Sequence, residues 1–185
     1  MAETRNAQAT KWVYLGLGSN LGDRQENIRQ AVARLEEAGI RMVRQSSLYE
    51  TEPVSRWPQR WYLNCVLAVE TELLPVRLLR ELQRIEREMG RRRIVPGGPR
   101  TIDIDILLYE QSILRSAELT IPHARMTERG FVLRPLREIA PDLRHPITRK
   151  TVAQMLVDSS DRHQVRLWRR AETTSAKPAA PSSTC

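Results

Sequence analysis

Two aspartates in the segment 101–109, TIDIDILLY, have the type and spacing needed to bind metal ions. The alternation of the segment predicts a strand, so Asp103 and Asp105 project from the same face. Residues two apart on a strand lie roughly 6–7 Å apart, and from there both carboxylates can reach one Mg²⁺ or share two. The alternative is the solvated face of a half-buried strand, although aspartate is disfavoured in strands. The apolar residues are predicted to share the opposite face (Ile102, Ile104, Ile106 and Leu108).

The loop before this strand is rich in arginine. Residues 84–100, RIEREMGRRRIVPGGPR, contain six arginines and only two glutamates. Phosphoryl-type transfer needs this combination, because metal ions bridge phosphate oxygens and arginines neutralise the charge on the transferred and leaving groups. A solvated helix end is the alternative, and we prefer it for Arg87 and Arg92. The Pro-Gly-Gly run at 96–98 predicts a mobile lid that closes over a nucleotide.

The segment 16–23, GLGSNLGD, follows a predicted strand and precedes a predicted helix. It lacks the Lys-Ser/Thr pair of the P-loop, and its glycine spacing misses the dinucleotide-binding fingerprint by one residue. We therefore interpret it as a tight strand-to-helix turn near the active site and not as a phosphate cradle.

Length and composition favour a single basic domain. The chain has 185 residues and a net charge of +8, and the excess is almost all arginine. A polyanionic partner is indicated, either nucleic acid or the phosphates of a small molecule. Cys65 lies in an apolar run and Cys185 ends a polar tail, so no disulfide framework follows. Without a signal-peptide-like or membrane-spanning run, we expect a cytoplasmic protein with no membrane partner.

The periodicity of apolar residues predicts six main elements. Strands are expected at 12–17, 40–50, 61–70 and 101–109, and helices at 23–38 and from Pro75 to Gly90. This order predicts an α+β fold with a ferredoxin-like βαββαβ core, a mainly antiparallel sheet packed by helices. Extra C-terminal helices are expected at 126–138 and 151–157. The domain would span 11–170, with disordered tails at 1–10 and 171–185.

Four segments form a joint pattern: GLGSNLGD at 16–23, YLN at 62–64, GPRTIDIDILLY at 98–109 and IPHARMTERGFVLRPLREIAPDL at 121–143. In this order and at this separation they resemble the 6-hydroxymethyl-7,8-dihydropterin pyrophosphokinases, over nearly all of residues 12–157. The resemblance implies transfer of pyrophosphate from ATP to the hydroxymethyl group of the reduced pterin, with release of AMP, in folate biosynthesis. It implies ATP as co-substrate and two Mg²⁺ ions.

The resemblance also implies residue roles. Asp103 and Asp105 would be the metal ligands, and Arg91 and Arg100 would act with them in catalysis. The ATP site would comprise Gln83, Glu86, Arg91, Arg93, Arg100, His123 and Arg129. The pterin site would comprise Thr51, Val54, Tyr62, Asn64 and Phe131. Tyr62 and Phe131 would sandwich the pterin, since a flat heterocycle gains most from offset stacking on both faces.

Three positions depart from the family pattern. Gly97 stands where many relatives have tryptophan, Ala124 where proline or tyrosine is frequent, and Glu52 where proline is common. These differences bear on affinity and loop closure and not on the reaction.

Two other classes of function remain as alternatives. A basic ferredoxin-like RNA-binding module would carry exposed aromatic and basic residues on a central strand, where TIDIDILLY has paired acids. A two-metal nuclease explains the acids but requires further carboxylates, and none is identified. We therefore expect small-molecule substrates, no nucleic acid and a monomer.

Overall fold

The computed structural model describes residues 9–54, 58–91 and 98–169. The strands are β1 (Lys11–Ser19), β2 (Arg41–Gln45), β3 (Tyr49–Thr51), β4 (Tyr62–Thr71), β5 (Asp103–Tyr109), β6 (Leu114–Arg115), β7 (Thr120–Ile121) and β8 (Val165–Leu167). The helices are α1 (Arg24–Glu37), α2 (Pro75–Glu88), α3 (Gly130–Ile139) and α4 (Val152–Asp158), with a 3₁₀ turn η1 (Met126–Glu128). The predicted tails, 1–10 and 171–185, fall almost wholly outside the described residues, so the domain limits stay a prediction.

The main sheet is antiparallel and has the strand order β5-β1-β4-β3-β8, with β2 also paired to β4. The first and third strands of the βαββαβ core are central, and β2 and β3 together take the place of the second strand. The α+β fold expected from the sequence is confirmed.

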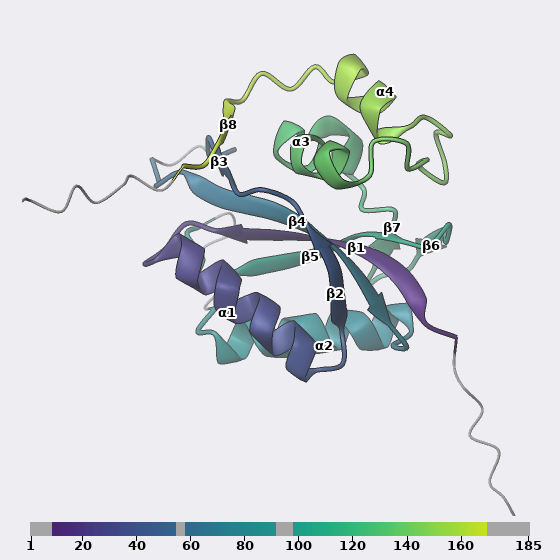
Figure 1. Ribbon diagram of the computed structural model, residues 1–185, viewed down its shortest axis with the longest axis horizontal. Coiled ribbons are helices and arrows are strands. Elements are labelled where there is room, and N and C mark those ends of the chain that lie inside the picture. Colours follow the sequence, from purple (N-terminus) through teal and green to yellow (C-terminus); the bar gives the residue numbers. More distant parts are fainter. Residues whose placement is uncertain (1–8, 55–57, 92–97, 170–185) are drawn as a thin grey trace, which may run out of the picture.

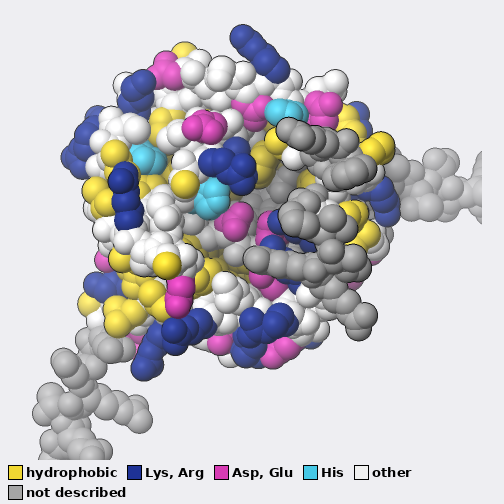
Figure 2. All heavy atoms as spheres, turned by 180° about the vertical axis from the view of Figure 1, so that it is seen from behind, with side chains coloured by type: hydrophobic (Ala, Val, Ile, Leu, Met, Phe, Trp, Pro, Cys, Tyr) yellow, Lys and Arg dark blue, Asp and Glu magenta, His cyan; other side chains and the backbone are white. Residues whose placement is uncertain are grey.

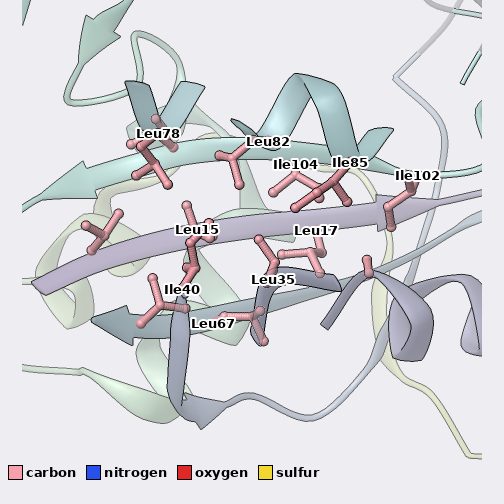
Figure 3. Packing of buried hydrophobic residues seen from close by; sticks show 14 of the residues in the cluster. Leu15, Leu17, Leu35, Ile40, Leu67, Leu78, Leu82, Ile85, Ile102 and Ile104 are labelled. Carbon is pink, nitrogen blue, oxygen red and sulfur yellow. The ribbon is translucent and has the colours of Figure 1, made fainter. Parts of the chain in front are cut away.

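Helices cover both faces of the sheet, α1 and α2 on one face and α3 and α4 on the other (Figure 1). Leu35 of α1 and Leu82 of α2 meet Leu15 of β1 in the larger core (Figure 3). A second core on the opposite face joins α3 and α4 to the sheet through Leu133 and Met155. None of the described helices is long and apolar enough to cross a bilayer.

The predicted helix boundaries agree with the local chemistry. The Asp23 side chain accepts the N–H of Glu26 at the start of α1, and Pro75 opens α2. Gly39 and Gly90 follow the two helices with φ of +74° and +81°, values that a side chain disfavours. Both helices therefore end close to the glycines that were predicted to stop them.

The segment predicted as one strand at 40–50 is interrupted between β2 and β3. Ser46 donates its backbone N–H to the Val66 carbonyl, and its hydroxyl accepts the N–H of Val66. Because the Ser46 hydroxyl takes the place of a backbone acceptor, hydrogen bonding to β4 continues between β2 and β3 although the strand itself is interrupted.

The helix predicted at 126–138 is likewise divided. Arg129 has an extended backbone with φ −118° and ψ 106°, and it separates η1 from α3. The helix predicted at 151–157 is α4, which begins with a capping box between Thr151 and Gln154.

The prediction that Leu108 shares a face with Ile104 and Ile106 is wrong. Leu15 pairs with Ile106 while Tyr14 pairs with Leu108, so Leu107 is an extra residue in β5, a β-bulge. Leu108 consequently packs into the second core with Tyr14, away from the isoleucines. The bulge lies beyond Asp103 and Asp105 and leaves their shared face unchanged.

Candidate active site

One pocket of about 480 Å³ opens over β1, β4 and β5. Figure 2 shows a face where acidic, basic and histidine side chains gather around a hollow. The pocket brings together most of the predicted site residues: Thr51, Val54, Tyr62, Asn64, Arg91, Arg100, Asp103, Asp105, His123, Arg129 and Phe131. Gln83 lies on α2 and does not line the pocket. Glu86 is connected to the pocket lining through its ion pair with Arg91. Arg93 and most of the predicted lid lie outside the described residues.

Two glycines of β1 form part of the pocket floor. Gly16 pairs with Asp105 and Gly18 pairs with Asp103, so β1 has no side chain at the two positions directly beside the aspartates. A Cβ on Gly18 would stand 2.6 Å from Oδ1 of Asn64. The segment 16–23 therefore begins as strand and turns only after Ser19, two residues beyond the strand end predicted at 17.

Arginine and carboxylate side chains form a continuous network at one end of the pocket. Arg91 pairs with both Glu86 and Asp103, and Arg100 also pairs with Asp103. Burial raises the pKa of Glu86, opposed by the N–H of Ile104, which donates to its carboxylate at 2.7 Å. This network ties α2 to β5 and orients two arginines toward the pocket.

Asp105 has a different environment. Its carboxylate makes no hydrogen bond to another described residue, and burial, then the nearby Asp103, raises its pKa. His123, when it is protonated, and the Arg129 guanidinium oppose this rise through their positive charge. Burial lowers the pKa of His123 itself. This wall of the pocket offers a ligand the Asp105 carboxyl, the Arg129 guanidinium and the His123 imidazole.

The pair of aspartates fits a metal ion whose remaining ligands come from the substrate and water. No group of three or more His, Cys, Asp or Glu side chains within the described ranges is placed to hold a metal alone. Mg²⁺ is commonly bound through one or two carboxylates plus substrate phosphates and water. Asp103 and Asp105, side by side on β5, meet that requirement.

The part of the pocket around Asn64 is aromatic and amide-lined. The Asn64 amide donates to Thr51 Oγ1 at 2.6 Å, and both residues are buried. Phe131 also lines the pocket, with the Arg129 guanidinium 5.3 Å from its ring centre, and Tyr62 lies where this part adjoins Arg100. Val54 is 62% exposed at the rim. The pocket thus has an apolar, hydrogen-bonding end and a charged end.

Sequence reasoning missed several lining residues. Arg125 and Gln59 line the pocket without a predicted role. Arg125 follows His123 by two residues in the same matched segment, and this proximity was an available signal. Gln59 lies in a proline-containing loop that offered no pattern.

A fold of this kind, with paired carboxylates and arginines in one pocket, defines an enzyme of the phosphotransferase class. The chain belongs to the 7,8-dihydro-6-hydroxymethylpterin-pyrophosphokinase (HPPK) family, whose model matches residues 14–141.

Relatives of similar length carry the same description. The chain is 42% identical over 158 residues to the 2-amino-4-hydroxy-6-hydroxymethyldihydropteridine pyrophosphokinase of Bacillus subtilis, covering 85% of this chain and 90% of that protein. The corresponding Aquifex aeolicus protein is 43% identical over 142 residues, covering 77% of this chain and 88% of that protein.

Other relatives are much longer. The folic acid synthesis protein fol1 of Schizosaccharomyces pombe is 46% identical over 159 residues, covering 85% of this chain, but the chain spans only 22% of that protein. A solved structure, Plasmodium falciparum HPPK-DHPS A437G with pteroate, is similar with a TM-score of 0.65 and 17% identity. That match covers 83% of this chain and 44% of the other, and it supports the fold.

Proposed function

We propose that the chain transfers pyrophosphate from ATP to the hydroxymethyl group of 6-hydroxymethyl-7,8-dihydropterin and releases AMP, in folate biosynthesis. The observation that carries this proposal is the two-ended pocket: an aromatic and amide end around Asn64 and a charged end around Asp103. Family membership and relatives of similar length named for the same activity support it.

The charged end suits the triphosphate of ATP. Arg91 and Arg100 lie there and Arg129 lines the same pocket, and an arginine guanidinium can form paired hydrogen bonds with phosphate oxygens. Phosphates would compete with Asp103 for Arg91 and Arg100, and so release that carboxylate. Arg93, His123, Gln83 and Glu86 keep their assignment to the nucleotide site as part of this proposal.

Mg²⁺ fits the same end. Asp103 and Asp105 would hold it, two ions being expected, and the bound metal supplies charge neutralisation and orientation of the phosphates. Arg91 and Arg100 stabilise the charge that develops on the transferred and leaving groups. The loose transition state of phosphoryl transfer needs little help from a general base.

The aromatic end suits the pterin. Tyr62 and Phe131 provide ring faces for stacking, and Asn64 and Thr51 provide hydrogen bonds to the edge of the heterocycle. The backbone of the loop at Val54 would also form hydrogen bonds with the pterin. Both ends of the pocket come from one chain, so we propose a monomer, acting in the cytoplasm on ATP and the reduced pterin without nucleic acid.

The deciding experiment measures AMP release from ATP and Mg²⁺ with and without 6-hydroxymethyl-7,8-dihydropterin. Pterin-dependent AMP is the expected result. Formation of ADP would make the chain a simple kinase, and no turnover would overturn the proposal. The Asp105→Asn variant should release AMP far more slowly, and Asp142→Asn, at an exposed position outside the pocket, is its matched control.

A further inference from the structure

The chain after α4 returns across the molecule to the edge of the main sheet (Figure 1). This return segment, residues 159–168, lies beyond residue 141, where the family match ends. It contacts two parts of the chain that carry the proposed pterin site, the start of α3 and the end of β3.

The first contact is made by Asp161. Its Oδ2 accepts the backbone N–H of Gly130 at 2.6 Å, while Oδ1 accepts the N–H of His163 at 3.0 Å. The Asp161 side chain is only 7% exposed. Gly130 is the first residue of α3, where N–H groups lack partners within the helix and a negative charge is favourable. The carboxylate therefore fixes the helix start immediately before Phe131.

The second contact is a strand pairing. Gln164 accepts the N–H of Glu52 on its carbonyl at 3.0 Å, and its own N–H donates to Glu52 Oε2 at 3.2 Å. The pairing continues as β8 against β3, with Val165 opposite Thr51. A proline at position 52 would have no N–H to donate. The pairing holds the strand that carries Thr51.

We propose that Asp161 is a positioning residue that, together with β8, fixes Phe131 relative to Thr51 and so shapes the pterin end of the pocket. This inference rests on the proposed function. Gly130 and Glu52 are 78 residues apart in the sequence, whereas Asp161 and Gln164 are three apart, so one short segment holds both walls. Asp161 does not line the pocket, and its effect on the substrate passes through Gly130.

The geometry around Gly130 explains why this contact is tight. A Cβ at Gly130 would lie 3.2 Å from Oδ2 of Asp161 and 3.7 Å from Cγ2 of Val165. The return segment therefore packs directly on the backbone of the helix start. Loss of the carboxylate would leave that N–H without its partner and allow the first turn of α3 to open, as helix ends do when they lack caps.

The test compares Asp161→Ala, Asp161→Asn and Asp158→Asn. Asp158 is the matched control, because its exposed carboxylate pairs with Lys150 at 2.8 Å and with neither wall of the pocket. Asp161→Ala should raise the KM for the pterin about tenfold, the effect of losing one charge-assisted hydrogen bond, with the KM for ATP close to wild type. Asp161→Asn, which keeps an acceptor oxygen, should recover part of the affinity, and the control should match wild type.

Equal losses for both substrates, or no loss, would overturn the inference. A second measurement does not depend on the reaction: the Gly130 amide should exchange with solvent faster in Asp161→Ala than in wild type, and unchanged exchange would also overturn it. If wild type itself neither binds the pterin nor releases AMP, the proposed function fails, and the amide exchange still decides whether Asp161 holds α3.

Discussion

The side-chain oxygen of Asn20 accepts the backbone N–H of Arg100 at 2.8 Å, and the backbone N–H of Asn20 donates to the Arg100 carbonyl at 3.1 Å. The Asn20 amide group also donates to Gln59 Oε1 at 3.0 Å and to the Arg60 carbonyl at 3.3 Å. One side chain, 1% exposed, thus joins the charged end of the pocket to the segment that leads into Tyr62.

Asn20→Ala should weaken both ends of the pocket together. The change removes the acceptor of the Arg100 N–H and the amide that donates to Gln59 and to the Arg60 carbonyl, which costs about 1–3 kcal/mol of stability for buried groups. We expect a lower midpoint in urea unfolding and a higher KM for both ATP and the pterin. Asn27→Ala is the control, since the Asn27 amide bonds only within the turn, to Ser19 and Leu21. A variant that raised only one KM would refute the joining role.

The two aspartates should behave alike in activity and oppositely in stability. Asparagine at either position should lower kcat about a hundredfold or more, because a metal ligand is lost. Asp103→Asn also removes the negative charge that pairs with Arg91 and Arg100, so the Tm should fall. Asp105→Asn should raise the Tm measured without Mg²⁺, since burial and the Asp103 charge raise the pKa of that carboxyl and disfavour its charged form. Near-normal turnover in both variants would refute the metal assignment.

Phe131→Ala should weaken pterin binding far more than ATP binding. The ring lines the aromatic end, and loss of one stacking face removes about 0.5–1.5 kcal/mol beyond the loss of buried area. Equilibrium binding of each ligand, followed by fluorescence, measures the difference. Phe131 is the sole phenylalanine of the chain, so its removal affects no similar ring. An equal effect on the two ligands would contradict the stacking role.

Gly18→Ala tests whether the pocket requires a residue without a side chain at position 18. The new Cβ would lie 2.6 Å from Asn64 Oδ1, so Asn64 must move away from Thr51 Oγ1. We expect a stability loss of about 1–3 kcal/mol from the clash and a higher Kd for the pterin. Gly16→Ala is the comparison, because its Cβ would meet the flexible end of Leu107 at 3.3 Å and should cost less. Equal losses of stability in the two variants would show that the contact between position 18 and Asn64 has no special role.

Local patterns in the sequence were sufficient to predict the elements and many of the residues that meet in the pocket. The alternation at 103–106 placed Asp103 and Asp105 on one face, and Gly39 and Gly90 marked the helix ends. Such features depend only on neighbouring residues. The same information placed the acids and arginines close together, because they adjoin in the chain.

The remaining features depend on partners that are distant in sequence. The bulge at Leu107 arises from the register of β5 against β1, and alternation within β5 alone cannot reveal it. Asn20 and Asp161 act through contacts 80 and 31 residues away, respectively. Neither residue has a local pattern that distinguishes it from an ordinary turn residue. Their contribution becomes visible only when the chain is folded.

The stability of the folded chain should fall below pH about 6.5, partly through His145. Burial lowers the pKa of His145 below its ordinary value of 6.5. Its Nδ1 accepts the backbone N–H groups of Ile147 at 3.3 Å and Thr148 at 3.2 Å, which requires that nitrogen to be unprotonated. The unfolded chain therefore binds the proton first as the pH falls, so the stabilisation is complete above pH about 6.5 and is lost below it.

Urea unfolding from pH 5 to pH 8 measures this effect through the difference between wild type and His145→Asn. Asparagine can accept the same two N–H groups through Oδ1 and does not titrate in this range. The variant should show a smaller decrease in the free energy of unfolding between pH 7 and pH 5. His123, whose pKa burial also lowers, is present in both proteins, and its contribution cancels in the comparison. Identical pH profiles would mean that protonation of His145 does not limit stability.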